Sequence, residues 1–301
     1  MSEFRLFKVI DSKVSEGRVD LFDVLRSLAI LLIVIGHLGF SVFSSIYPPG
    51  KVGVSIFIIL SGMALEYVYG SRNIDVGNFY WRRLLRIYPT YFLALILAAF
   101  ILGKQSLPSN IFESLLTFTG LCAFAGKWGC SLVETSWFIG LIMSLYLFYP
   151  YLSKWTKQSP YTMIGTLFFA NLVSNFMVTK VVPLPNQPLD WFPFCRIFEF
   201  GLGIFLVRQQ TVRSVLDNFR LPMLRTSVRY TSDLSLPVFL IHFPLISTIP
   251  FWKSFGGTFG GLAAYSCLTV ILSHILLSID RFIQQKIKEL PNPHRATSLN
   301  T

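Results

Sequence analysis

The stretch DVLRSLAILLIVIGHLGF, Asp23 to Phe40, has the composition of a helix that crosses a membrane. A bilayer-spanning helix needs about 18 or more largely apolar residues, and this stretch supplies them. Two ionisable side chains, Arg26 and His37, interrupt the apolar run. Because an ionisable group in hydrocarbon is costly, we interpret both residues as candidates for a functional site.

The composition of the whole chain agrees with this interpretation. The 301 residues have a mean hydropathy of +0.58, and only 14% of them are charged. Apolar blocks separated by Pro- and Gly-containing turns predict an all-α, polytopic transmembrane helical bundle with about nine to ten membrane segments. The blocks are roughly 23–41, 52–70, 88–103, 110–126, 136–152, 160–178, 192–207, 234–251 and 259–280. Within them, Pro89 is expected to end or begin a helix, and Gly256–Gly261 to form a flexible turn.

The net charge of +11 is carried by short connections between the apolar blocks. Such a distribution fits cytoplasmic loops and anionic headgroups, or an anionic substrate, and does not require nucleic acid. It predicts a cytoplasmic N-terminal segment over 1–20, a transmembrane domain over 21–283 and a polar tail over 284–301. The arginine-rich stretch 208–230 also ought to be cytoplasmic, yet seven preceding spans would place it outside. Either one segment does not cross, or a helix is missing or hidden.

Arg26 and His37 lie eleven positions apart, so they share one helix face and are separated by about 16 Å along the axis. This distance is too large for both to act on one atom. Each residue also has a simpler interpretation: Arg26 as an anchor at the cytoplasmic boundary, and His37 as a buried histidine bonded to a neighbouring helix.

Several segments of the sequence favour the functional interpretation of Arg26 and His37. They are LFDVLRSLAILLIVIGH, GVSIFIILSGMAL, FYWRRLLRIYPTYF, ETSWFIGLIMSLYLFYP, FCRIFEFGLGIFL and LSLPVFLIHFPL. In this order they resemble the acyltransferase-3 family of membrane acyltransferases, which O-acetylate bacterial surface polysaccharides. The resemblance covers about 18 to 283, and the family's Arg-x10-His element falls on Arg26 and His37. Ser27 stands where the family usually has glycine.

The resemblance and the residue chemistry together suggest roles. Acyl transfer from a thioester to a sugar hydroxyl needs a base, and neutral histidine serves near pH 7, so His37 is the expected general base. Arg26 is expected to orient the donor, acetyl-CoA or another acyl-CoA, at the inner mouth. The anionic end of that donor suits three further arginines, Arg82, Arg83 and Arg86.

Three residues are expected to be accessory: Ser136 and Trp137, which are candidates for the acceptor path, and His242, which matches a family word. No metal-ligand spacing is present in the sequence, and no permanently bound cofactor is expected. The pair Arg196 and Glu199, at i and i+3, is expected to neutralise itself and can line a cavity.

The resulting hypothesis is an enzyme of the bacterial cytoplasmic membrane that transfers an acyl group from acyl-CoA to a carbohydrate acceptor. Its expected partners are the bilayer, the two substrates and proteins of polysaccharide biosynthesis, with no nucleic acid. A multi-pass carrier or flippase for a glycan precursor, and an inactive membrane scaffold, remain alternatives. Four cysteines, Cys122, Cys130, Cys195 and Cys267, lack C-x-x-C spacing and are expected to be small buried side chains.

Overall fold

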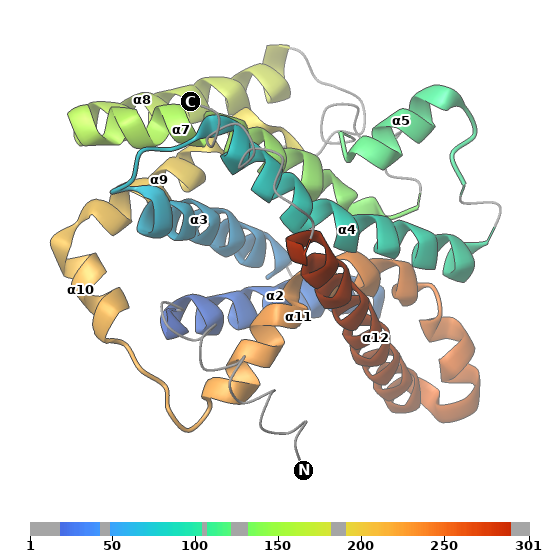
Figure 1. The fold of residues 1–301 in the computed structure, drawn as a ribbon. Coiled ribbons are helices and arrows are strands. Elements are labelled where there is room, and N and C mark those ends of the chain that lie inside the picture. Colours follow the sequence, from blue (N-terminus) through green and yellow to red (C-terminus); the bar gives the residue numbers. More distant parts are fainter. Residues whose placement is uncertain (1–18, 43–48, 104–106, 122–131, 182–190, 290–301) are drawn as a thin grey trace.

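A computed structural model describes most of the chain, and all of the regular secondary structure in the described part is helical (Figure 1). The described residues are 19–42, 49–103, 107–121, 132–181 and 191–289. The predicted all-α membrane bundle is therefore confirmed.

The larger helices are α2 (Asp20–Val42), α3 (Gly50–Tyr69), α4 (Val76–Leu102), α7 (Trp137–Gln158), α8 (Pro160–Phe176), α9 (Ile197–Arg208), α11 (Arg225–Ile246) and α12 (Ile249–Glu289). The shorter elements are α5 (Ile111–Thr119), α10 (Gln210–Asn218), the single turns η3 (Glu134–Ser136) and η6 (Pro193–Cys195), and the π-helical turn η4 (Met177–Val181). Figure 1 shows α5 and α10 at the periphery of the bundle.

Six helices of the described part are long and apolar enough to cross a membrane, namely α2, α3, α4, α7, α8 and α12. Large apolar side chains on these helices also face outward: Phe100 is 82% exposed and Phe259 88% exposed. Such a surface would be a liability in water, whereas lipid tails cover it at no cost.

Helix α3 lies in the middle of the bundle and packs against α2 and α9 (Figure 1). Glycines permit this close approach. A Cβ atom on Gly36 would lie 2.6 Å from the backbone nitrogen of Gly50, and one on Gly62 would lie 2.2 Å from the carbonyl oxygen of Phe200. Small residues at helix contacts are the usual means of close packing in membranes. The first of these contacts lies directly beside His37.

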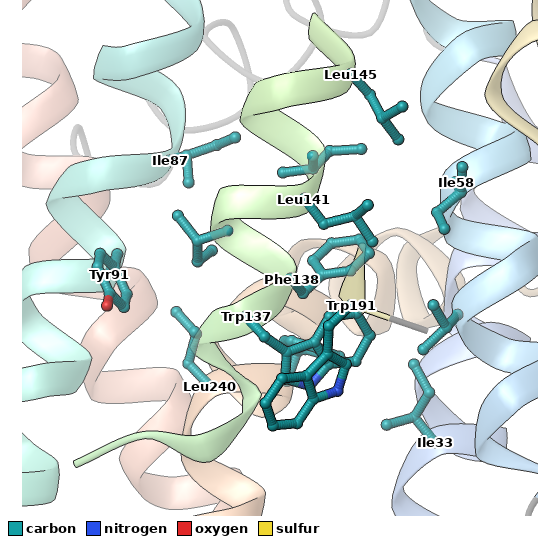
Figure 2. Close-up of a cluster of buried hydrophobic side chains, with 14 of the residues drawn as sticks. Ile33, Ile58, Ile87, Tyr91, Trp137, Phe138, Leu141, Leu145, Trp191 and Leu240 are labelled. Atoms are coloured by element: carbon teal, nitrogen blue, oxygen red, sulfur yellow. The ribbon is translucent and has the colours of Figure 1, made fainter. Parts of the chain in front are cut away.

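Helix α7 forms the other half of the core. Figure 2 shows it running between α4, which contributes Ile87 and Tyr91, and the helices that contribute Ile33 and Ile58. Tyr149, near the far end of α7, is buried and donates a hydrogen bond to the carboxylate of Glu66 at 3.0 Å. This packing fixes the positions of α2, α3, α4 and α7 relative to one another.

Two of the predicted spans are corrected by the structure. The described part of 110–126 contains only α5, whose nine residues extend about 14 Å, and 192–207 contains the twelve-residue α9 of about 18 Å. Both are shorter than the ~30 Å of a hydrocarbon core. The sequence pattern overestimated them because the apolar run in the sequence is longer than the helix in each case.

Contacts across the bundle place the arginine-rich stretch 208–230 directly. Arg225 binds Asp20, at the beginning of α2, with a 3.0 Å contact, and Arg208 donates to the carbonyl oxygen of Gly70 at 2.9 Å. The stretch therefore lies at the same end of the bundle as the beginning of α2. We call this end the basic end.

Proline and glycine break the helices differently from the prediction. Pro89 lies inside α4, so the expected helix boundary at Pro89 is wrong. Helices α7 and α11 likewise contain prolines in their interiors. Membrane helices tolerate proline because neighbouring groups satisfy the freed carbonyl. The turn predicted at Gly256–Gly261 is reduced to one residue, Gly257, which has φ 62° and kinks α12. Helix α12 runs to Glu289, so the predicted boundary between 283 and 284 falls inside it.

Candidate active site

His37 on α2 and His242 on α11 are in direct contact. Nε2 of His242 lies 3.1 Å from Nδ1 of His37, and the ring centroids are 4.9 Å apart. His242 is 0% exposed, whereas His37 is only partly buried. The ring that can reach a substrate is therefore that of His37.

The hydrogen bonds of the two rings define their tautomers. Nδ1 of His242 lies 2.9 Å from the carbonyl oxygen of Val238, which only accepts, so this nitrogen carries the hydrogen. In a neutral ring Nε2 of His242 is then the acceptor for the Nδ1–H of His37. That same N–H also faces the carbonyl oxygen of Ile33 at 3.0 Å. The lone pair of a neutral His37 is consequently on Nε2.

The helices around the pair are held at this level by further contacts. The hydroxyl of Tyr265 on α12 donates to the carbonyl oxygen of His242 at 3.2 Å. The ring of Phe243 meets the ring of His37 edge-on, with centroids 5.2 Å apart. The first contact ties α12 to α11 beside the pair, and the second restricts how the His37 imidazole can turn.

Arg26 lies in a cavity of about 180 Å³ together with Arg83 and Arg86. We call it the arginine cavity; α2, α3, α4, α7 and α11 all contribute to it. The guanidinium of Arg83 lies 5.7 Å from the ring centroid of Phe79 and donates to the Tyr69 hydroxyl at 3.5 Å. Asp233, the acid among the described lining residues, is bound by Arg281 at 2.7 Å. The lining is therefore strongly cationic.

Arg82 is not among the described lining residues of the arginine cavity. Its side chain is exposed, and Nε donates to the side-chain oxygen of Asn78 at 3.0 Å. The structure therefore brings Arg83 and Arg86 together with Arg26 and leaves Arg82 on another face of α4. One residue of difference turns a helical side chain by about 100°.

A layer of three aromatic rings separates the arginine cavity from the histidine pair. Phe57, Phe138 and Phe239 line the cavity, with centroid distances of 6.2, 6.5 and 5.0 Å among them. The ring of Phe239 is also 6.0 Å from that of His242. We call these three residues the aromatic layer.

Ser136 and Trp137 lie beside the aromatic layer, at the beginning of α7. The neighbouring Thr135 donates to the carbonyl oxygen of Phe239 at 3.0 Å, which joins η3 to α11. Trp137 stacks on Trp191 with centroids 5.7 Å apart, as Figure 2 shows. Both Ser136 and Trp137 are buried.

Comparison with known families is consistent with this arrangement: a family profile, described as an acyltransferase domain, matches residues 19–227. The chain belongs to the acyltransferase-3 family. It is accordingly a multi-pass membrane protein with the acyltransferase activity of that family. Neither the curated proteins nor the solved structures include a significant match to the chain.

Within this acyltransferase, the family's Arg-x10-His residues have different surroundings. Arg26 belongs to the arginine cavity, and His37 belongs to the histidine pair. His242 lies beyond the matched range, yet its side chain completes the pair. Among the described residues, no group of three or more His, Cys, Asp and Glu side chains gathers as metal ligands would.

The contacts that set the register of α2 against α11 are not evident from the sequence. Asp20 binds both Arg225 and Arg229, and Asp23 accepts a 2.7 Å hydrogen bond from Ser232. From the sequence, the arginines of 208–230 were expected only to set the topology. The sequence signal for these contacts was the presence of Asp20 and Asp23 at the beginning of the first span, together with the many arginines of 208–230.

Of the two cysteines in the described part, Cys195 is buried as expected, whereas Cys267 is exposed on α12. Both are free thiols. Cys122 and Cys130 lie outside the described residues.

Proposed function

We propose that the chain transfers an acetyl group from acetyl-CoA to a hydroxyl group of a glycan or glycan precursor, with His37 as the general base. The observation that carries this proposal is the histidine pair. Through it the lone pair of His37 is directed to Nε2, one aromatic layer away from a cavity with three arginines.

In the proposed reaction, His37 takes one proton from the acceptor and later gives it to the leaving group. Nε2 of His37 takes the hydrogen of the acceptor hydroxyl, whose oxygen attacks the thioester carbonyl carbon. The tetrahedral intermediate collapses, the carbon–sulfur bond breaks, and the departing thiolate takes the proton back from His37. The products are an acetyl ester and free coenzyme A.

His242 is proposed as a positioning residue. Its Nε2 accepts the Nδ1–H of His37, which keeps that ring in one tautomer and stabilises the imidazolium that forms during attack. Because His242 is fully buried and neutral, it performs this role without an added charge in the bilayer.

The arginine cavity is proposed as the donor site. Arg26, Arg83 and Arg86 offer planar, charge-assisted donors that match phosphate oxygens. A donor anchored there must reach about 16 Å along α2 to bring its thioester to His37. The extended, uncharged pantetheine arm can cover this distance if it displaces the aromatic layer.

The basic end is proposed to face the cytoplasm of a bacterial cell, where acyl-CoA is available. This orientation is supported by the positively charged connections gathered there, since such loops stay on the cytoplasmic side. The N-terminus of α2 would then be cytoplasmic, and His37 would lie toward the outer leaflet.

The test combines two measurements. Full-length protein in lipid nanodiscs is given acetyl-CoA labelled in the acetyl group, and release of free coenzyme A is followed. Surface glycans from cells with and without the gene are then compared by mass spectrometry. We expect His37-dependent thiol release and an acetyl-sized mass difference.

Other outcomes contradict the proposal in distinct ways. Movement of a glycan precursor across the membrane without acetyl transfer would make the chain a carrier. Neither transfer nor translocation in correctly inserted protein would leave a membrane scaffold. Acetylation of a lipid or protein in place of a glycan would refute the acceptor class alone.

A further inference from the structure

A second cavity of about 280 Å³ lies between α3, α8 and the beginning of α9. Its lining is polar, with Lys51, Asn171, Asn175, Arg196 and Glu199 beside Cys195 and Phe198. Small-molecule sites begin at a similar volume, roughly 300 Å³. Polar groups from three helices within a membrane bundle are costly, so their convergence points to a ligand.

The lining is held by hydrogen bonds both within and between helices. Arg196 binds Glu199 at 2.7 Å, and the same carboxylate oxygen accepts from Ser55 on α3 at 2.9 Å. On α8, the side-chain nitrogen of Asn175 donates to the backbone carbonyl oxygen of Asn171 at 2.8 Å, and that of Asn171 donates to the carbonyl oxygen of Cys195 at 2.5 Å. The cavity is therefore a built site with fixed walls.

One acceptor of the lining stands out. The second carboxylate oxygen of Glu199 is buried and has no hydrogen-bond partner among the described residues. A buried carboxylate oxygen without a donor is costly, and a ligand hydroxyl supplies that donor.

The charges of the lining select the ligand's chemistry. Lys51 and Arg196 are cationic, Glu199 is anionic, and the two asparagines offer both donors and acceptors. A phosphate would meet the Glu199 carboxylate, whereas a hydroxyl group can donate to Glu199 and accept from Lys51. Phe198 adds an apolar wall for the carbon face of a sugar ring.

The cavity is also well placed relative to His37. Lys51 is next in sequence to Gly50, and His37 is next to Gly36; at these two glycines the backbones of α2 and α3 approach each other closely. Lys51 is in the first turn of α3, far along that helix from the basic end, where Arg208 binds Gly70. The cavity thus lies toward the end of α3 that is opposite the basic end.

We propose that this cavity binds an uncharged sugar residue of the acceptor, holding it beside the end of α2 that carries His37. The assignment rests on the proposed function for its role in catalysis. Binding of the sugar itself does not depend on that function and can be tested alone.

The binding test uses thiol labelling of the full-length chain in nanodiscs. The four native cysteines are replaced by serine, and Asn175→Cys is introduced in the lining. Thr179→Cys, one turn further along the same face of the chain and exposed, is the matched control. A polar maleimide is applied with and without glucose, galactose, mannose, rhamnose or N-acetylglucosamine, and with inorganic phosphate.

At least one sugar is expected to slow labelling of Asn175→Cys by the factor 1 + [sugar]/Kd, about tenfold at about ten times the Kd. Labelling of Thr179→Cys should not change. The site assignment is overturned if no sugar protects, if both cysteines are protected alike, or if phosphate protects better than every sugar. Failure of Asn175→Cys to label while Thr179→Cys reacts would also overturn it, because the cavity would then be closed.

The catalytic role has a separate readout. With labelled acetyl-CoA and the protecting sugar, Asn175→Leu should lower the ratio of acetyl transfer to sugar over transfer to water about tenfold, and Thr179→Leu should leave that ratio unchanged. An unchanged ratio in Asn175→Leu would overturn the acceptor role. Absence of all acetyl release would refute the proposed function, while the labelling result would still decide whether the site binds sugar.

Discussion

The two ends of α2 differ in how they hold their functional side chains. At the end that carries His37, the ring bonds to the fully buried His242, and Gly36 brings the backbone of α3 into contact. At the end that carries Arg26, the helix borders a cavity, and Arg86 on its far wall is exposed. One helix thus joins a tightly packed site to an open one.

This difference corresponds to two kinds of chemistry. Proton transfer demands a ring held in one tautomer within hydrogen-bond reach of the substrate, so rigid packing helps it. Binding of a phosphate needs long, charged side chains that can change conformation, and several donors each contribute part of the binding free energy. Substitutions at the histidine end should therefore affect the rate, and those at the arginine end should affect donor affinity.

The largest effect is expected from His37. His37→Ala and His37→Gln should each reduce acetyl transfer by about 100-fold or more, because neither side chain can take the proton. Expression and membrane insertion should persist, since removing an ionisable group from a membrane helix carries no desolvation cost. Transfer of label from acetyl-CoA, normalised to folded protein, measures this.

The same pair of variants separates catalysis from packing. If His37 only packs, glutamine should largely preserve activity, and alanine should lower the thermal stability. Substantial turnover by His37→Gln would move the base elsewhere, with His242 next to be tested.

A smaller effect is expected from His242. Replacement by alanine should lower the maximal rate about 10- to 100-fold, as is typical when the partner that orients a functional histidine is lost. The KM for acetyl-CoA should stay constant, because the donor site lies beyond the aromatic layer. His242→Gln retains an acceptor oxygen for the Nδ1–H of His37 and should restore part of the rate.

A purely structural role for His242 predicts a different pattern. The rate and the thermal midpoint would then fall together, and glutamine would restore both or neither. A loss of rate in a protein with an unchanged midpoint, partly rescued by glutamine, identifies the positioning role.

The arginine end should respond through affinity. Arg86→Ala should raise the KM for acetyl-CoA about tenfold, since a charge-assisted hydrogen bond contributes about 1.5 kcal/mol or more. Arg83→Ala should behave similarly. The dependence of KM on salt should weaken in both variants, because one screened contact has been removed.

Arg82→Ala is the matched control on the same helix. Its side chain bonds to Asn78 and is not among the described lining residues, so its KM should match that of the unmodified chain. Equal losses from Arg82 and Arg86 would indicate a diffuse electrostatic attraction in place of a defined donor site.

Hydropathy predicted where the helices lie in the sequence, but it did not predict which of them are long enough to cross the membrane. Every predicted apolar block contains a helix, because a backbone in lipid must satisfy its own hydrogen bonds. Hydropathy cannot tell α5, with nine residues, from a span, since further apolar residues of the sequence extend the block. Pro89 misled for a related reason: lipid-embedded helices accept a proline that a water-exposed helix would not.

The geometry of the candidate site was predictable only within one helix, although candidate residues on other helices were recognised. The spacing of Arg26 and His37 gave their separation on α2, but contacts between helices far apart in sequence have no signature in a single chain. The contact of His37 with His242 spans 205 positions, and that of Asp20 with Arg225 likewise depends on how α11 docks. Which of Arg82, Arg83 and Arg86 faces inward depends on the rotation of α4 about its axis.

The smallest effect is expected from Ser27, which is next to Arg26 on α2. Its hydroxyl donates to the carbonyl oxygen of Val228 at 3.1 Å and so joins α2 to α11. Ser27→Ala should cost about 0.6 kcal/mol, a typical value for a hydrogen bond between membrane helices. The cost stays small because the Val228 carbonyl, inside α11, keeps its own helical hydrogen bond. The measurement is the thermal midpoint in detergent.

Ser278→Ala is the control, because its hydroxyl bonds to a carbonyl oxygen within its own helix, that of His274, at 2.9 Å. Its midpoint should not change, while that of Ser27→Ala should fall by about 2 °C. Ser27→Gly, which introduces the family's usual residue, should lose the same hydrogen bond and somewhat more stability through backbone entropy. If either Ser27 variant instead raised the KM for acetyl-CoA as much as Arg86→Ala does, Ser27 would belong to the donor site, and the division between the two ends of α2 would have to be redrawn.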